Sequence, residues 1–282
     1  MVPTPAPPLK VQDLSRWAPA ADRRNPIAVL QEQEADRLPW LVPVRHSRMA
    51  HDAFAFYRGT PAVMAHDLGN APSSGLEVQL CGDCHLANFG FYASPEWSLV
   101  FDLNDFDETV RGPFEWDLKR LVASAVLAGR SLALSSDQQG HVARRTARAY
   151  RKAMQTLATQ SLHQVWAQRI DVDAYVNELE HPPLRQHVLK LSAKARAHTS
   201  SEAAGKLCEL GPDGDLQLRH DPPLIWRHAE LDRSWTADID WRDLAQKHLE
   251  LYLCSVPAEV RHRLQRYHLV DAAMKAVGVG SV

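Results

Sequence analysis

The chain has 282 residues, of which 45% are hydrophobic and 23% are charged, and its formal net charge is −2. This composition is typical of a globular protein with one large or two small domains. Acidic and basic residues are interleaved, which argues against nucleic-acid binding, and no apolar run approaches the length of a membrane-spanning helix. With four cysteines and no signal peptide, we expect a cytoplasmic protein with neither a nucleic-acid nor a membrane partner, while the oligomeric state stays open.

The chain begins with a proline-rich segment. Residues 1–24 contain five prolines and are predicted to form an extended lead-in, ahead of a single domain over residues 25–282. Asn25 and Pro26 supply a helix cap and a first turn, which predicts a helix to about Leu38. The aromatic and small residues of 53–68 predict one further helix.

Three short apolar runs follow, and they are predicted to be β-strands. They cover residues 78–80, 89–92 and 99–101. The polar loop 81–88 lies between the first two strands, and a run of acidic residues follows the third. This arrangement places Asp83, Asn88 and Asp102 at the tips of neighbouring strands, where folds commonly present functional groups.

The second half of the chain reads as mainly helical. An apolar stripe with helical period runs from Leu118 to Ala128, and Ser135 or Ser136 caps a further helix to about Ala158. Further elements are predicted as helices to about residue 198, a turn at 211–215 within a small hairpin, and helices from about 240 to 276 that break at Pro257. The predicted fold is therefore α+β and predominantly helical.

The polar residues at the strand tips have the spacing of a phosphoryl-transfer site. In protein kinases a catalytic aspartate precedes a metal-binding asparagine by five residues, and a second metal-binding aspartate lies on the next strand. Asp83, Asn88 and Asp102 have this spacing. The alternative is a turn in which Asp83 and Asn88 bond only to the backbone, followed by a solvated acidic loop.

The loop also resembles known families. Gly82 to Asn88 is similar to the G-D-x-H-x-x-N loop of aminoglycoside phosphotransferases. Residues 54–59, 79–90 and 101–120 more closely resemble the bacterial domain-of-unknown-function family DUF2252. Together these resemblances imply a protein-kinase-like large lobe, in which a small β-hairpin region carries the site.

The resemblance implies a role for each loop residue. Asp83 would be the catalytic base, and Asn88 and Asp102 would hold Mg²⁺, with Asp105 as a helper. His85 would order the loop by hydrogen bonding. Asp117 would accept hydrogen bonds from backbone amides of the loop, or else it is simply an acid that suits the first turn of a helix.

Two other features of the sequence allow further interpretations. Cys81, Cys84 and His85 form a C-x-x-C-H pattern that is typical of haem attachment, but such attachment requires export and no export signal is visible. Half of a zinc site is a further alternative, although Cys208 and Cys254 provide no second C-x-x-C. Among the arginines before the loop, Arg45, Arg48 and Arg58 are candidates for phosphate contacts, and Arg58 is the one assigned to cofactor binding.

An ordinary kinase has a glycine-rich loop and a phosphate-pairing lysine ahead of its catalytic loop, and this chain has neither there. Gly278 and Gly280 at the C-terminus form G-x-G, which resembles the start of such a loop in permuted order. We therefore expect an incomplete nucleotide lobe and a weakly active or inactive form of an ATP- and Mg²⁺-dependent phosphotransferase. Its partners would be a nucleotide and an unknown acceptor. The alternative is a non-catalytic kinase-like module that binds a nucleotide, a metal or a protein.

Overall fold

A computed structural model describes residue 14 and residues 18–231 and 240–278. The chain divides into two compact units, residues 1–196 and 197–282. The structure is mixed, with many helices and small antiparallel sheets, which agrees with the predicted α+β class. The single domain expected over residues 25–282 stays a prediction, and most of the proline-rich lead-in lies outside the described residues.

The first unit begins with four short helices: α2 (Pro26–Glu34), α3 (Val42–Met49), α4 (Ala53–Arg58) and α5 (Pro61–Gly69). The Asn25 side chain caps α2 as predicted, although this helix ends before Leu38. The single helix expected over 53–68 is wrong, because α4 ends at Arg58 and α5 starts with Pro61. Proline has no amide hydrogen and disfavours a helical conformation in the residue before it. The first helix therefore ends before Pro61, and a second helix begins at this residue.

Four strands carry the loop region, and they form two antiparallel pairs. Strand β1 (Glu77–Leu80) pairs with β4 (Val110–Pro113), and β2 (Phe89–Ala93) pairs with β3 (Leu99–Leu103). The three predicted strands are therefore confirmed. Leu80 pairs with Val110, and Phe89 pairs with Leu103. The β1–β2 connection therefore starts beside the end of the β3–β4 connection and ends beside its start.

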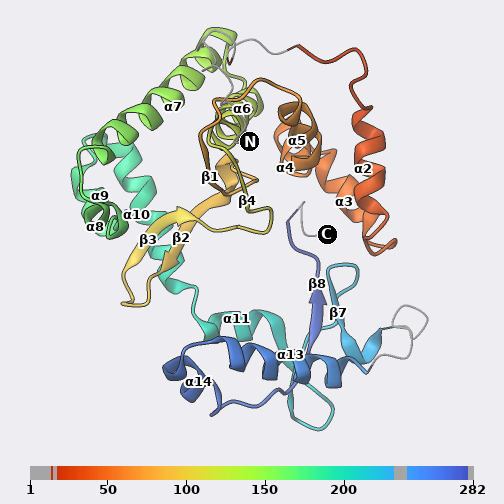
Figure 1. Cartoon of the computed structure of the whole chain (residues 1–282). Helices are drawn as coiled ribbons and strands as arrows, with labels where there is room; N and C mark the ends of the chain where they lie inside the picture. Colours follow the sequence, from red (N-terminus) through yellow and green to blue (C-terminus); the bar gives the residue numbers. More distant parts are fainter. Residues whose placement is uncertain (1–13, 15–17, 232–239, 279–282) are drawn as a thin grey trace, which may run out of the picture. The chain divides into compact units, whose positions relative to one another are not determined.

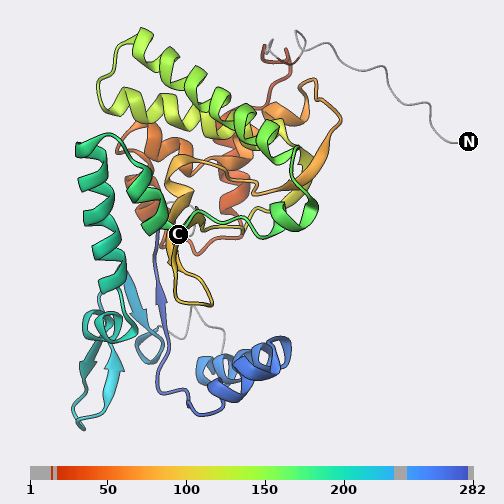
Figure 2. The same ribbon diagram turned by 90° about the vertical axis from the view of Figure 1, so that its left-hand side faces the viewer.

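A pair of long helices supports these strands. Helix α6 (Glu115–Ser131) packs against α7 (Ser136–Leu157) and against α4 (Figure 1). Ser135 caps α7 through a capping box with Gln138, which confirms the predicted start of this helix. Figure 2 shows α6 and α7 running alongside each other over the rest of the first unit.

Three further helices follow in the first unit. They are α8 (Leu162–Trp166), α9 (Val172–Glu178) and α10 (Pro182–Ala197). Val172 and Val176 of α9 form a buried cluster with Leu99 of β3, and Phe91 and Phe101 pack against it. This apolar cluster packs α9 against the β2–β3 pair.

The second unit combines helices with two small strand pairs. Its helices are α11 (Ser200–Leu207), α13 (Trp241–Ser255) and α14 (Ala258–Leu264), and its strand pairs are β5 (Cys208–Leu210) with β6 (Leu216–Leu218) and β7 (Ile225–Arg227) with β8 (Ala273–Lys275). The predicted hairpin around 211–215 and the break at Pro257 are confirmed. The helix expected to reach residue 276 is wrong, because α14 ends at Leu264 and Met274 lies in β8, paired with Trp226. Pairing with a distant strand supplies backbone hydrogen bonds that local sequence does not reveal.

Among the described helices, none combines the length and the apolar character needed to cross a bilayer.

Candidate functional site

The loop from Cys81 to Asn88 connects β1 to β2 and is anchored by the first turn of α6. Asp117 accepts hydrogen bonds from the amide of Cys81 at 2.8 Å and from the amide of Gly82 at 3.1 Å. This is the contact that the resemblance implied for Asp117. Burial raises the pKa of Asp117, while the two amide hydrogen bonds act in the opposite direction. The carboxylate of Asp117 therefore determines the path of the loop at its start.

Gly82 provides the backbone conformation that the anchored loop requires. Its φ is +86°, a region that side-chain-bearing residues rarely adopt. A Cβ atom at this position would lie only 1.9 Å from the carbonyl oxygen of Glu108. The loop can approach the β3–β4 connection this closely because residue 82 has no side chain.

Asp83 points to a buried arginine of α6. Arg120 Nε donates to Asp83 Oδ1, and the side chains are 3% and 13% exposed respectively. The guanidinium also donates to the Tyr57 carbonyl at 3.0 Å and lies 4.4 Å from the centre of the Tyr57 ring. Burial raises the pKa of Tyr57 to about 12, so its hydroxyl remains protonated and donates to the carbonyl of Arg120. Asp83 is thus held by an ion pair whose cation is itself fixed by α4.

Asn88 joins the two connections. Its Nδ2 donates to the carbonyl of Asp83 at 3.0 Å and to the carbonyl of Asp105 at 3.2 Å, and it contacts Cys81 Sγ at 3.5 Å. The Asn88 carbonyl accepts a hydrogen bond from the Asn104 amide at 2.9 Å. Asn88 is buried, so these bonds satisfy a side chain that solvent scarcely reaches.

His85 lies beside Asp83 within the same loop. Its Nε2 is 3.6 Å from Asp83 Oδ2, and its ring meets Phe54 edge-on, with 6.4 Å between the ring centres. Burial lowers the pKa of His85, and the positive charges of Arg120 and Arg58 act in the same direction. Nδ1 of His85 is buried and has no hydrogen-bond partner among the described residues.

The predicted metal ligands are less closely assembled. Asp102 is exposed, and its Oδ1 accepts a hydrogen bond from the neighbouring Leu103 amide. Asp105 is also exposed, and it reaches Asn88 through its backbone carbonyl rather than its carboxylate. Among the described residues, no group of three or more His, Cys, Asp or Glu side chains is arranged to hold a metal ion. The assignment of Asn88, Asp102 and Asp105 to Mg²⁺ stays a prediction.

Glu108 lies on the loop side of a small cavity. The cavity has a volume of about 190 Å³ and is lined by Gly82, Glu108, Arg120, Gln33 and several apolar side chains. Loss of solvation raises the pKa of Glu108, and the nearby carboxylates of Asp83, Asp105 and Asp107 add to this effect. Gln33 Oε1 is buried and lacks a hydrogen-bond partner among the described residues. The cavity therefore offers polar groups next to the Asp83 loop that a small ligand could satisfy.

The two loop cysteines interact with each other. A hydrogen bond from the Cys84 thiol lowers the pKa of Cys81, and the amide of Asp83 adds to this effect. The same thiol–thiol contact and burial raise the pKa of Cys84. Both side chains are buried, and both are free thiols.

The predicted phosphate-binding residues lie in different surroundings. Arg45 is buried and donates to Glu34 and to the carbonyl of Gly59, so it supports the fold of α3 and α4. Arg58 is half-buried, and its positive charge contributes to the lowered pKa of His85. Gly278 belongs to the second unit and has a φ of +64°, and Gly280 lies outside the described residues.

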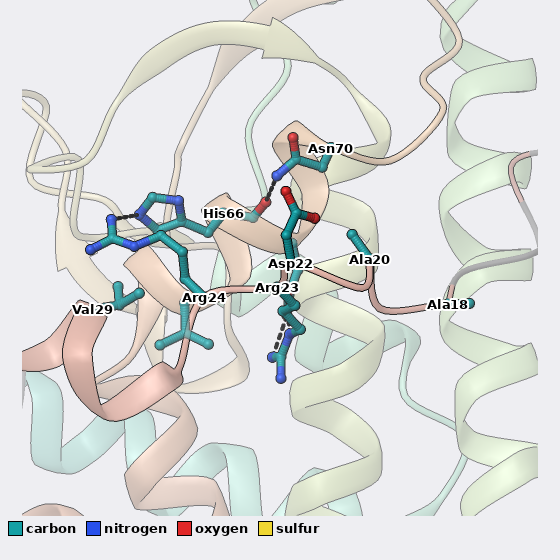
Figure 3. Close-up of a pocket in the computed structure, with 10 residues that line it drawn as sticks. Ala18, Ala20, Asp22, Arg23, Arg24, Val29, His66 and Asn70 are labelled. Atoms are coloured by element: carbon teal, nitrogen blue, oxygen red, sulfur yellow. Dashed lines mark hydrogen bonds and ion pairs between the residues drawn. The ribbon is translucent and has the colours of Figure 1, made fainter.

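Two other cavities of the first unit share no residue with the Asp83 loop. One, of about 220 Å³, lies between the start of α2 and the end of α5 (Figure 3). Both arginines in its lining are paired, because Arg23 contacts Asp67 at 2.6 Å and Arg24 contacts both Glu32 and His66. The other, of about 710 Å³, is mainly apolar and is lined by residues of α4, α5 and α6.

Sequence reasoning missed Arg120 and Ser124. Both lie on the face of α6 that carries Asp117, three and seven positions further along. Ser124 is fully buried, and its hydroxyl accepts a hydrogen bond from the Leu86 amide at 3.1 Å. Once Asp117 is assigned to the loop, helical spacing indicates that these two residues face it as well.

Comparison with known families matches residues 37–282 to a family described as an uncharacterized protein conserved in bacteria, DUF2252. The chain belongs to this family, which confirms the resemblance seen in the sequence. The family description names no activity, and nothing in the match supports a kinase relationship. No curated protein and no solved structure matches the chain significantly.

Proposed function

We propose that this chain contributes the acceptor-activating and metal-binding side of an ATP- and Mg²⁺-dependent phosphotransferase that acts on a small molecule. The observation that carries the proposal is the anchored loop. Asp117 and Ser124 of α6 bind its backbone, Asn88 closes it on the Asp83 carbonyl, and the Asp83 carboxylate lies within it. A loop held by so many bonds presents one carboxylate in a fixed position, as general base catalysis requires.

Arg120 defines how Asp83 would act. One carboxylate oxygen is bonded to the guanidinium, while the other faces His85 at 3.6 Å. Because a carboxylate has several lone pairs, Asp83 can still accept a hydrogen bond from an acceptor hydroxyl. In this arrangement its role is to orient the hydroxyl and to receive its proton as the bond to phosphorus forms, while Arg120 keeps the carboxylate from rotating.

The cavity beside Gly82 supports the proposal that the acceptor is a small molecule. A volume of about 190 Å³ is sufficient for a compact organic molecule, and Arg120 and Glu108 lie in its wall. An acceptor bound there would reach the loop at the point where Asp83 follows Gly82. The apolar part of the lining would exclude water from the hydroxyl that reacts.

The donor chemistry of the neighbouring residues suits Mg²⁺. The Asn88 amide and the carboxylates of Asp102 and Asp105 are hard oxygen donors, and both aspartates are exposed to an incoming ion. When bound, the ion would neutralise charge on the nucleotide phosphates. Arg58 would add a positive charge on the side of His85.

A second candidate, a non-catalytic module that binds a nucleotide, a metal or a protein, is favoured by one observation. Arg120 already pairs with Asp83, and the pair is largely buried. An aspartate in such a pair can serve purely to hold the loop. The two candidates differ in whether replacing Asp83 abolishes phosphoryl transfer or affects only the stability of the loop.

The test combines calorimetry with a phosphate-transfer assay. We expect Mg-ATP to bind, with affinity at least tenfold weaker in Asn88→Ala and Asp102→Asn but unchanged in the exposed control Asp107→Asn. Asp83→Asn should retain Mg-ATP binding and lose transfer to a panel of small alcohols and amines, although slow transfer is expected even for the unchanged chain. Lack of Mg-dependent ATP binding would refute the proposal. Binding without any transfer dependent on Asp83 would establish the non-catalytic module.

A further inference from the structure

The Cys81–Cys84 pair is the part of the loop that phosphoryl transfer does not use. The two cysteines enclose Gly82 and Asp83, and both are buried free thiols of one short loop. They are 5% and 7% exposed, so solvent reaches them only slightly. The other two cysteines of the chain, Cys208 and Cys254, belong to the second unit.

The loop conformation favours closure of this pair. Gly82 turns the backbone through a φ of +86°, and the Cys81 amide is fixed by Asp117. A disulfide needs its two Cα atoms within about 7 Å and its Cβ atoms facing each other. Two buried free thiols at either end of a two-residue turn are close enough along the chain for such a bond to form within the loop.

We propose that Cys81 and Cys84 are a site of reversible oxidation, at which a small peroxide converts the two thiols into an intramolecular disulfide. The low exposure of both sulfurs selects a small oxidant over a bulky disulfide. This proposal does not depend on phosphoryl transfer, since it concerns only the two thiols and the bonds around them.

The chemistry proceeds in two balanced steps. One thiol takes an oxygen atom from hydrogen peroxide, which forms a sulfenic acid and releases one water molecule. The second thiol attacks the sulfenic sulfur, the S–O bond breaks, and the oxygen leaves as a second water molecule. Two thiols are oxidised to one disulfide, and one peroxide is reduced to two waters. An added dithiol reverses the change by exchange.

Oxidation would alter the contacts that hold the loop against the acidic connection. Cys81 Sγ donates to the Asp105 carbonyl at 3.5 Å and contacts Asn88 Nδ2 at 3.5 Å. A disulfide places the sulfurs about 2.05 Å apart and removes the thiol hydrogen, so the donation to Asp105 is lost. Asn88 also holds the Asp83 carbonyl, and the change therefore reaches the segment that positions Asp83.

The experiment uses the full chain with Cys208→Ser and Cys254→Ser, which leaves only the two loop thiols. After treatment with hydrogen peroxide, we expect the intact mass to fall by the mass of two hydrogen atoms. Both thiols should become unreactive to a thiol reagent in denaturant, and the protein should remain monomeric on a non-reducing gel. Dithiothreitol should restore both thiols. Adding Cys84→Ser or, separately, Cys81→Ser should instead give a sulfenic acid that dimedone traps.

Circular dichroism identifies any variant that fails to fold, and Cys84→Ala then replaces Cys84→Ser. A mass gain of oxygen without loss of hydrogen in the two-thiol chain would overturn the proposal, as would two thiols that stay reactive after treatment. Amide hydrogen exchange tests the consequence for the loop. The amides of Cys81, Gly82 and Asn104 should exchange at least tenfold faster in the oxidised chain, and unchanged exchange would show that the disulfide leaves the loop in place.

Discussion

The two connections between the strand pairs lie side by side, yet they are stabilised in different ways. The loop Cys81–Asn88 is largely buried, and its polar groups are bonded by Asp117, Arg120 and Ser124 of α6. The acidic connection after β3 is exposed, and its carboxylates bond to nearby amides, as Asp105 does to Asp107. Buried polar groups need partners from other elements, whereas exposed ones can rely on water.

This difference indicates separate roles within the candidate site: the loop positions Asp83, and the exposed carboxylates are available to bind a ligand. The loop holds Asp83 in one place whether or not a ligand is present. Asp102 near the end of β3 and Asp105 in the acidic connection are both open to solvent, where a cation could recruit them. If this view is correct, substitutions in the loop reduce stability, and substitutions in the acidic connection reduce only ligand binding.

The largest effect is expected for Arg120→Ala. This change leaves the Asp83 carboxylate buried without its cation and removes the packing on Tyr57, which costs about 3–5 kcal/mol of the free energy of unfolding. Arg130→Ala is the matched control, since Arg130 is an exposed arginine of the same helix, and it should stay within about 0.5 kcal/mol. Urea denaturation measures both. Equal losses would show that the ion pair does not hold the loop.

Gly82→Ala should be the next most damaging change. The new Cβ would collide with the Glu108 carbonyl, at about 1–3 kcal/mol, in addition to about 1–2 kcal/mol for the left-handed backbone. Gly75→Ala is the control, because Gly75 has a similar φ of +72° and open space around it. The difference in unfolding free energy between the two variants isolates the contact between the connections. If both alanine variants lose the same stability, the close approach does not exist in solution.

Asp117→Ala tests whether this residue holds the loop or only suits a helix start. Losing the acceptor for the Cys81 and Gly82 amides should cost about 1.5–3 kcal/mol. Asp137→Ala removes an exposed acid from the first turn of α7 and should cost about 0.3–1 kcal/mol. Thermal or chemical unfolding measures both values. A loss in Asp117→Ala no larger than in the control would favour the helix-start interpretation.

The smallest effect concerns pH and His85. Burial lowers the pKa of His85 from its ordinary value of 6.5 in the folded chain. As the pH falls, His85 therefore takes up its proton at a higher pH in the unfolded chain than in the folded chain. The stability that is present above pH 6.5 is lost as the pH falls from 6.5 to the lowered pKa of the folded chain. One proton limits the slope to about 1.4 kcal/mol per pH unit.

Urea titrations between pH 8 and pH 5 check this expectation. His85→Gln should flatten the dependence, whereas His187→Gln, which replaces an exposed histidine of α10, should leave it unchanged. The same slope in all three proteins would mean that His85 titrates alike in the folded and unfolded chains.

Local patterns predicted the strands around the loop, the Asn25 and Ser135 caps and the hairpin at 211–215. These features depend on nearest neighbours, so short stretches of sequence contain the necessary information. Prediction failed where distant partners decide the outcome. Met274 became part of a strand because Trp226 lies opposite, and the helix expected over 53–68 was divided at Pro61, a signal that the aromatic pattern obscured.

By itself the sequence determined which groups the site could contain: Asp83, Asn88 and Asp102 at strand tips, and two cysteines around a glycine. Only the tertiary structure decided that Arg120 forms an ion pair with Asp83, that Asn88 joins the two connections and that Asp102 remains exposed to solvent. The physical reason is that a buried polar group must find its partner wherever the fold brings one, and that partner can lie far along the chain. Arg120 is 37 residues from Asp83, a separation at which no local pattern links the two residues.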